Sequence, residues 1–167
     1  MPDAFSQDKR SEIMKKVKAK DTRLEKSVRS ALWRLGYRFR KHDPNLPGKP
    51  DMVFAGAKTV VFIDSCFWHG CPKHLRMPKS NRDYWRHKIE GNRTRDEDIN
   101  RQYRDLDWQA IRIWEHTIRE SFEETICKLA EILEARYARG SLPPKEQAAV
   151  NIQDWLQADA SKPAAPG

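Results

Sequence analysis

The spacing of apolar side chains predicts three well-defined helices. The clearest begins at Thr22, where Thr22 and Glu25 fit a capping box, and it ends at Gly36. A long, highly charged helix is expected over residues 82–106 and a third over residues 118–137. In the first and third of them apolar residues recur every three or four positions, which is the period of a helix with one buried face, whereas the long helix carries fewer apolar residues: Trp85, Ile89, Ile99, Tyr103 and Leu106.

Strand patterns separate these helices. Residues 37–40 alternate aromatic and arginine side chains, and residues 52–54 form a short apolar run. Residues 59–63 are nearly all apolar and β-branched, which is typical of a central strand buried on both faces. Residues 110–114 predict a later strand. This order predicts an α/β domain with a central mixed sheet flanked by helices.

The chain divides into three expected parts. Residues 1–20 form a basic N-terminal arm, in which residues 7–19 carry too few apolar side chains for a helix that is stable without a partner. Residues 21–138 form the folded domain. Residues 139–167 contain several prolines and alanines and are expected to be a flexible tail.

Positive charge is concentrated in the first third of the chain. Residues 9–49 hold 14 Lys and Arg against four Asp and Glu, a local net charge of +10, whereas the charges of residues 50–167 balance. Such a segment is typical of proteins that contact the phosphate backbone of nucleic acids. A solvated basic face is the alternative, so charge alone indicates only a polyanionic partner.

The composition argues against membrane-spanning and disulfide-rich secreted proteins. No apolar run approaches the roughly 20 residues that cross a bilayer. The first residues lack the charged and apolar regions of a signal peptide, and three cysteines are not a disulfide framework. We therefore expect a cytoplasmic protein.

Two aspartates lie at strand ends where a metal site is expected. Asp51 precedes the strand at 52–54 and Asp64 follows the strand at 59–63, so adjoining strands bring both carboxylates to one end of the sheet. Carboxylate oxygens suit Mg²⁺, which polarises a phosphoryl oxygen and activates water. Taken alone, the dipeptide Pro50-Asp51 fits an ordinary turn better than a metal site.

The loop after the second aspartate holds a second set of potential metal ligands. Three of them have the spacing C-x4-C-x2-H and a fourth follows a later strand: Cys66, Cys71, His74 and His116. Four such ligands form a closed tetrahedral zinc site, which would hold a loop without a core of its own. Buried cysteines with surface histidines are the alternative. Cys127 lies on the apolar face of a helix and is interpreted as a core residue.

Phe67, Trp68 and His69 lie between the first two cysteines. Neighbouring aromatic residues on an exposed loop suit stacking on DNA bases or wedging between base steps, with burial in the protein core as the alternative. His69 titrates near neutral pH, so it is a candidate to take a proton from an attacking water at the adjacent metal. A loop histidine with an ordinary hydrogen bond is the alternative.

Several segments occur together in one order: the Met14 region, Asp21-Thr22 with Glu25-Lys26, Leu46 to Asp51, Asp64 to Pro72, Tyr84-Trp85 with Lys88-Ile89, and Ile113-Trp114-Glu115. In this order, over about residues 9–137, the chain resembles very short patch repair (Vsr) endonucleases. The resemblance implies a restriction-endonuclease-like core with a zinc-pinned loop. It also implies nicking of one DNA strand 5′ to the thymine of a T·G mismatch, which arises when 5-methylcytosine deaminates.

The resemblance also implies roles for individual residues. Asp51 would bind Mg²⁺ together with the backbone carbonyl of Ile63. His69 would assist the attacking water, and Glu25 would hold a hydrated metal or support His69, beside its role in the capping box. The structural zinc ligands would be Cys66, Cys71, His74 and His116. The side chains that enter the duplex would be Phe67, Trp68 and Trp85 from the major groove and Met14, on the DNA-embracing arm, from the opposite groove.

The chain departs from the family pattern at Asp64, where the best-known form has a histidine. Asp64 is therefore expected to act as a second carboxylate ligand of Mg²⁺. The expected partner is double-stranded DNA with a T·G mismatch, with other mismatch-repair proteins as further candidates. We expect a monomer that acts at the nucleoid of a prokaryotic cell. The alternatives are a non-catalytic zinc-stabilised DNA-binding protein and a nuclease without mismatch preference.

Overall fold

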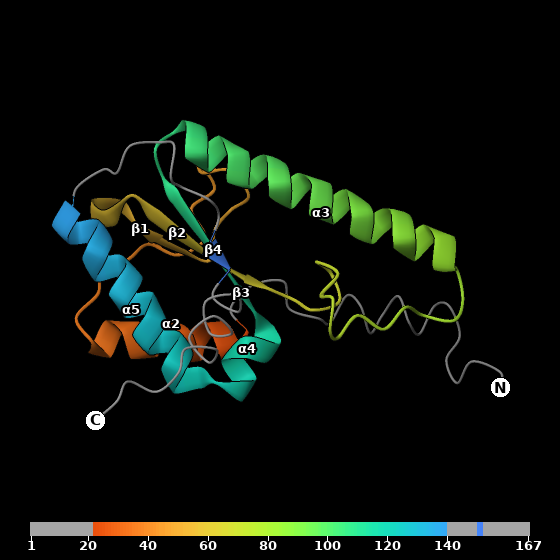
Figure 1. Ribbon diagram of the computed structural model, residues 1–167, viewed down its shortest axis with the longest axis horizontal. Helices are drawn as coiled ribbons and strands as arrows, with labels where there is room; N and C mark the ends of the chain where they lie inside the picture. The colour runs from red at the N-terminus through yellow and green to blue at the C-terminus, as the bar shows by residue number, and fades with distance from the viewer. Residues whose placement is uncertain (1–21, 140–149, 152–167) are drawn as a thin grey trace, which may run out of the picture.

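A four-stranded mixed sheet lies between one long helix and a group of three helices (Figure 1). The structure is a computed structural model, which describes residues 22–139 and 150–151. In their order across the sheet, the strands are β1 (Met52–Phe54), β2 (Thr59–Asp64), β3 (Gln109–Trp114) and β4 (Val150–Asn151). β1 is antiparallel to β2, whereas β2, β3 and β4 are parallel. The carboxyl-terminal ends of β2 and β3 therefore meet at one edge, beside the start of β1.

Helices cover both faces of the sheet. One face is covered by α3 (Arg82–Asp105), and the other by α2 (Arg23–Arg34), α4 (Glu115–Glu120) and α5 (Phe122–Arg139) (Figure 1). A short 3₁₀ turn, η1 (Ala55–Ala57), joins β1 to β2. The predicted α/β domain with a mixed sheet between helices is thus confirmed.

Alternate residues of the central strands belong to two different cores. Val61 of β2 packs in the core shared with α2, α4 and α5. Its neighbours Val60 and Phe62 pack in a second core with Ile99 and Tyr103 of α3. Because successive side chains of a strand point to opposite faces, this strand has to be apolar on both, as its composition predicts.

The start of α2 matches its sequence signal. The Thr22 side chain caps the helix by accepting a hydrogen bond of 3.3 Å from the backbone N–H of Glu25. At the other end of the helix, Leu35 is the C-cap residue. Gly36 follows it with a φ of +97°, the left-handed conformation that ends many helices. This helix positions Glu25 on its inner face.

The single helix predicted over residues 118–137 is wrong in its bounds. The chain enters α4 directly from β3, breaks at Ser121, and resumes as α5. Ser121 has φ −142° and ψ 56°, far from helical values, and its carbonyl accepts from the hydroxyl of Thr125 at 2.7 Å. The apolar period runs across the break because Ile118 and Ile126 share one core. Cys127, interpreted as core, is exposed instead.

The strand predicted over residues 37–40 is reduced to one bridge. Arg40 exchanges two backbone hydrogen bonds with Val53, of 3.0 and 2.8 Å, and pairs no further. Tyr37 and Phe39 pack against the ring of Phe54, with centroids 6.4 and 5.4 Å away. The aromatic residues of this segment therefore close one end of the core without extending the sheet.

The two ends of the chain are described only in small part. β4 pairs with Ile111 and Arg112 of β3. It lies within residues 139–167, whose flexibility stays a prediction. The arm of residues 1–20, including Met14, lies outside the described residues. In the part of the chain that the structure describes, no helix is long and apolar enough to cross a membrane.

Candidate active site

Asp51 lies at the sheet edge where β1 begins. Its backbone N–H donates to the carbonyl of Val61 at 3.0 Å, and its carboxylate Oδ2 accepts from the N–H of Ile63 at 2.7 Å. In a strand, the N–H and C=O of one residue point to the same side. The carbonyl of Ile63 is therefore directed toward the same side of β2 as Asp51.

Glu25, His42 and Asp51 form a first group of potential ligands, with one donor atom from each within 4.8 Å of the others. His42 lies between the two acids: its Nδ1 is 3.8 Å from Asp51 Oδ1, and its Nε2 is 3.9 Å from Glu25 Oε2. Arg29, one helical turn after Glu25, pairs with that carboxylate at 3.5 Å. His42 has a φ of +50°, an uncommon conformation for a residue with a side chain.

Burial controls the charge of Asp51. Burial, with the charges of Glu25 and Asp64, raises the pKa of this carboxyl to about 7, against the opposing effect of the hydrogen bond from Ile63. Ionising a carboxyl that is buried beside other acids costs free energy, and a bound cation would offset that cost. The donor set of oxygen atoms with one imidazole fits a divalent cation.

Asp64, His69 and Asp96 form a second group at the same edge of the sheet. His69 Nδ1 is hydrogen-bonded to Asp96 Oδ2 and lies 3.8 Å from Asp64 Oδ1. Because a carboxylate only accepts hydrogen bonds, the proton lies on Nδ1 and the neutral ring keeps Nε2 as an acceptor. Burial alone would lower the pKa of His69, but the hydrogen bond to Asp96 and the charge of Asp64 outweigh it and raise the pKa.

The structure thus places the two predicted carboxylates in neighbouring groups. Asp51 lies with Glu25, whereas Asp64 lies with His69, and both Asp64 oxygens accept from Arg112, at 2.9 and 3.1 Å. Burial raises the pKa of Asp64, and the charge of Arg112 opposes that rise. A histidine with a free acceptor nitrogen beside a site for a cation is suited to activate water for hydrolysis.

The four predicted zinc ligands, Cys66, Cys71, His74 and His116, lie together in a third group. The shortest contacts are 3.3 Å from Cys66 Sγ and 3.5 Å from Cys71 Sγ to His116 Nδ1, and 3.7 Å from Cys71 Sγ to His74 Nδ1. Tetrahedral zinc with bonds of about 2.0–2.3 Å separates its ligand atoms by roughly 3.3–3.8 Å, so this donor set fits the ion. Burial raises the pKa of Cys66, a rise that a bound cation would reverse, and it lowers the pKa of His116, which is the direction in which a bound cation would also act.

Comparison with known proteins shows the family of this chain. A family model described as DNA mismatch endonuclease Vsr matches residues 2–74. The DNA mismatch endonuclease Vsr of Escherichia coli is 35% identical over 136 residues, which cover 80% of this chain and 86% of that protein. This chain belongs to the Vsr family. The family predicted from the sequence motifs is therefore confirmed.

Other Vsr-like relatives carry a different name. The type II nicking enzyme V.XorIIP of Xanthomonas oryzae is 40% identical over 139 residues, 81% of this chain and 94% of that protein. The type II nicking enzyme V.NaeI of Lentzea aerocolonigenes is 38% identical over 129 residues, 74% of this chain and 76% of that protein. The similarity spans most of the described domain.

The aromatic residues predicted for the DNA contact of this Vsr chain form one cluster. Ring centroids of Phe67 and Trp68 are 5.1 Å apart, and Trp85 lies 5.4 and 5.9 Å from them. All three are half-buried, so the cluster is partly accessible. Tyr84, which is 59% exposed, extends it at 5.2 Å from Trp85. Tyr84 was part of the family motif but not of the predicted contact residues.

Gly70 places this cluster against α3. Its φ is +67°, and a Cβ added there would lie 2.8 Å from Ile89 Cγ2 on the helix. The carbonyl of Trp68 accepts from the side chain of Asn92 at 2.9 Å, also on α3. The loop and the start of the helix therefore form one surface, in which Trp85 meets the two loop aromatics.

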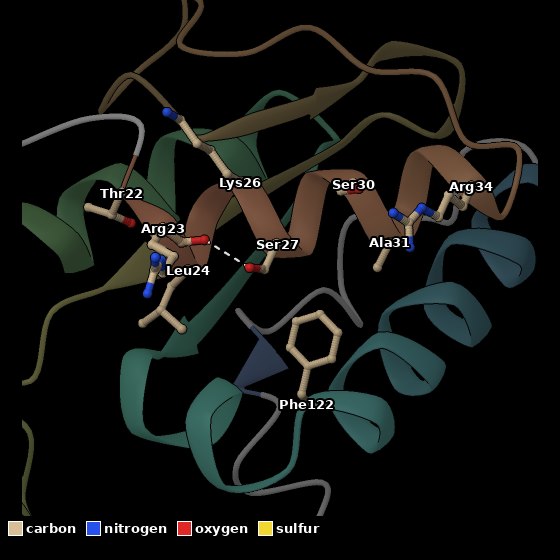
Figure 2. A pocket seen from close by; sticks show the side chains of 9 residues that line it. All are labelled: Thr22, Arg23, Leu24, Lys26, Ser27, Ser30, Ala31, Arg34 and Phe122. Carbon is tan, nitrogen blue, oxygen red and sulfur yellow. Dashed lines mark hydrogen bonds between the residues drawn. The ribbon is translucent and has the colours of Figure 1, made fainter.

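A pocket of about 750 Å³ lies between α2 and the start of α5, and Glu25 is not among its lining residues (Figure 2). Phe122 lines it, together with three cationic side chains, Arg23, Lys26 and Arg34. The lining contains no carboxylate, cysteine or histidine. The pocket therefore lacks the groups for metal-assisted hydrolysis and is separate from the candidate active site.

Three residues of the site were not found from the sequence, namely His42, Asp96 and Arg112. Asp96 is one of many charged residues of α3, and nothing in its spacing marks it. Arg112 carried a usable signal, since it stands between Ile111 and Ile113 in a strand that is otherwise apolar after its first residue, Gln109. A charged residue in the middle of a buried strand indicates a buried partner of opposite charge.

Proposed function

We propose that this Vsr-family chain is a Mg²⁺-dependent DNA endonuclease that nicks one strand 5′ to the thymine of a T·G mismatch. The nick would start very short patch repair of deaminated 5-methylcytosine. The observation that carries the proposal is the meeting of Asp51 and the His69–Asp96 pair at one sheet edge, in a chain of this family. The core would be restriction-endonuclease-like.

Asp51 and the backbone carbonyl of Ile63 would hold Mg²⁺, with Glu25 reaching it through water. The side chain of Asp51 accepts from Ile63, which supports a shared site for the carboxylate and the carbonyl. When bound, Mg²⁺ polarises a phosphoryl oxygen and stabilises the leaving oxygen. Asp64 was also expected to bind Mg²⁺, but its contacts with Arg112 and its distance of 3.8 Å from His69 favour a role on the histidine side.

His69 would take the proton from the attacking water. Its Nδ1–H is held by Asp96, so Nε2 is the atom that accepts. The carboxylate fixes the tautomer and the direction of the ring, and it stabilises the imidazolium once the proton has moved. Asp96 thus has the role of a positioning residue for His69.

The zinc site would hold the loop that carries the aromatic cluster. Cys66 and Cys71 flank Phe67 and Trp68, so a closed site at these cysteines fixes the backbone on both sides of the aromatics. Phe67, Trp68 and Trp85 would wedge between base steps from the major groove. A T·G pair is already disturbed, so opening a step there costs less than opening a matched one.

Positive charge near the chain start would supply the phosphate contacts. Residues 9–49 carry a net charge of +10, part of it on the arm on which Met14 would approach from the opposite groove. One asymmetric mismatch needs only a monomer. The substrate would be chromosomal DNA at the nucleoid of a prokaryotic cytoplasm, with other mismatch-repair proteins as further partners.

A panel of end-labelled T·G duplexes with varied flanking bases tests the proposal. Both strands are labelled in separate reactions, with and without added Mg²⁺. We expect one nick, 5′ to the thymine, only when Mg²⁺ is present, and no product with Asp51→Asn. Binding without any nick in the whole panel would instead support the DNA-binding alternative.

A second function has support in the names of the relatives. V.XorIIP and V.NaeI are called type II nicking enzymes, which indicates nicking but not a mismatch requirement. A nuclease without mismatch preference would nick the matched C·G duplex as fast as the T·G duplex with the same flanks. The same panel, extended by the matched duplexes, separates the two functions.

A further inference from the structure

Arg112 lies in the middle of β3, where its guanidinium contacts a different neighbour on each side. Nη1 donates to both oxygens of Asp64, at 2.9 and 3.1 Å, and Nε donates to Asn100 Oδ1 at 2.9 Å. Nη2 lies 3.4 Å from Asp96 Oδ1. The plane of the group lies over Phe62, with 4.4 Å from Cζ to the ring centroid.

These contacts join the strand to the helix at the catalytic edge. Asp64 ends β2, while Asn100 and Asp96 lie one helical turn apart on α3. A guanidinium is planar and presents its N–H groups in a fixed fork, so it restricts the positions of all its partners at once. Lysine has one donor atom and cannot reproduce this geometry.

The two carboxylates that Arg112 joins are the ones that flank His69. Asp96 Oδ2 accepts from His69 Nδ1 while its other oxygen, Oδ1, faces Arg112. Asp64 Oδ1 lies 3.8 Å from the same histidine nitrogen and 2.9 Å from Arg112. Arg112 thus separates two acids that would otherwise repel each other, and it does so without touching the histidine.

The burial of Arg112 indicates that it contacts other protein groups and not the DNA. Its side chain is 12% exposed, and Nη2 is a buried atom that has no hydrogen-bond partner in the described part of the chain. A phosphate of bound DNA would have to displace neighbouring groups to reach this atom. A direct contact with DNA is therefore the less favoured role.

We propose that Arg112 is a positioning residue of the nicking reaction. It holds Asp96 in the orientation that accepts from Nδ1 of His69, and it neutralises the paired charge of Asp64 and Asp96. This inference rests on the proposed function of His69. Arg112 acts through Asp96, so its loss should slow the bond-breaking step and leave DNA affinity almost unchanged.

The kinetic test uses Arg112→Lys and Arg112→Ala. The matched control is Arg101→Ala, which removes a guanidinium paired with Asp98 at 3.2 Å on the exposed side of α3. Misplacement of a catalytic group by about an ångström costs on the order of a hundredfold in rate. We expect that loss in kcat for Arg112→Ala, with KM within about threefold of wild type. The control should match wild type.

Two further measurements separate positioning from a purely structural role. Added methylguanidinium should restore part of the rate of Arg112→Ala but none of the rate of His69→Ala. Proton NMR of the protein with zinc but without Mg²⁺ should show a downfield Nδ1–H signal from His69 in wild type and in Arg101→Ala. That signal should weaken or vanish in both Arg112 variants. If Arg112→Ala does not fold, the same measurements on Arg112→Lys test the proposal, since lysine retains the positive charge and loses the forked arrangement of N–H donors.

Two results would overturn the proposal. One is an unchanged His69 signal together with wild-type kcat in the Arg112 variants. The other is a loss of DNA affinity at constant kcat, which would make Arg112 a phosphate contact. The NMR signal needs neither DNA nor Mg²⁺. Failure of the wild-type protein to nick T·G duplexes would therefore refute the proposed function while the positioning role is still measured.

Discussion

The Asp51→Asn substitution should separate the stability of the fold from the function of the site. The Asp51 side chain is only 16% exposed, and burial, with the nearby charges of Glu25 and Asp64, raises its pKa to about 7. Asparagine has nearly the same shape and keeps an oxygen to accept from the N–H of Ile63, 2.7 Å away. Asparagine carries no charge, so above pH 7 and without Mg²⁺ the variant should be more stable than wild type.

The size of this effect follows from the pKa. A protonated Asp51 contributes stability that is fully present below its ordinary pKa of 3.8 and is lost as pH rises to about 7. One pKa unit corresponds to about 1.4 kcal/mol, so the whole loss is roughly 4 kcal/mol. Between pH 5 and pH 8, wild type should lose about 2–3 kcal/mol more of its free energy of unfolding than Asp51→Asn.

Urea unfolding at pH 5 and pH 8, in magnesium-free buffer that retains zinc, measures this difference. Added Mg²⁺ should then stabilise wild type at pH 8 and leave the variant almost unchanged, because a ligand stabilises only a fold that binds it. A difference between the two proteins that stays constant from pH 5 to pH 8 would refute the raised pKa. Equal stabilisation of both by Mg²⁺ would place the ion elsewhere.

Five other substitutions, one of them a control, test single roles. His69→Ala should lower the single-turnover nicking rate by about 10²–10⁴-fold with DNA affinity retained, and Asp96→Asn should lower it less, whereas exposed Asp98→Asn should not. Cys71→Ser should remove bound zinc and lower the melting temperature; an unchanged melting curve would contradict the four-ligand site. Trp68→Ala should weaken discrimination of T·G from matched duplex more than overall binding, and equal losses would indicate a core tryptophan.

The elements with the strongest apolar patterns were the predictable ones. The strand predicted at 59–63 is β2 and the helix predicted at 82–106 is α3, each within one residue at either end. β2 is buried on both faces, so burial alone fixes its composition. Ser121 was missed because the helical period continues through it, and a backbone break leaves no trace in side-chain spacing.

The three zinc ligands that lie close together in the sequence were the most predictable part of the site. Cys66 to His74 could be grouped by spacing, and the structure brings them together with His116. Asp96 and Arg112 lie 27 and 43 positions beyond His69, and only the packing of α3 and β3 places them beside it. Asp64 illustrates the same limit, because its sequence position fits a metal ligand while its contacts depend on Arg112.

The preference for the mismatch is the central claim, and one ratio tests it directly. Single-turnover nicking rates are measured with Mg²⁺ on a T·G duplex and on the C·G duplex with identical flanks, at saturating protein. We expect nicking of the thymine strand of the T·G duplex at least about a hundredfold faster, equivalent to about 2.7 kcal/mol of discrimination. Equal rates on the two duplexes, or nicks in both strands, would contradict a mismatch endonuclease.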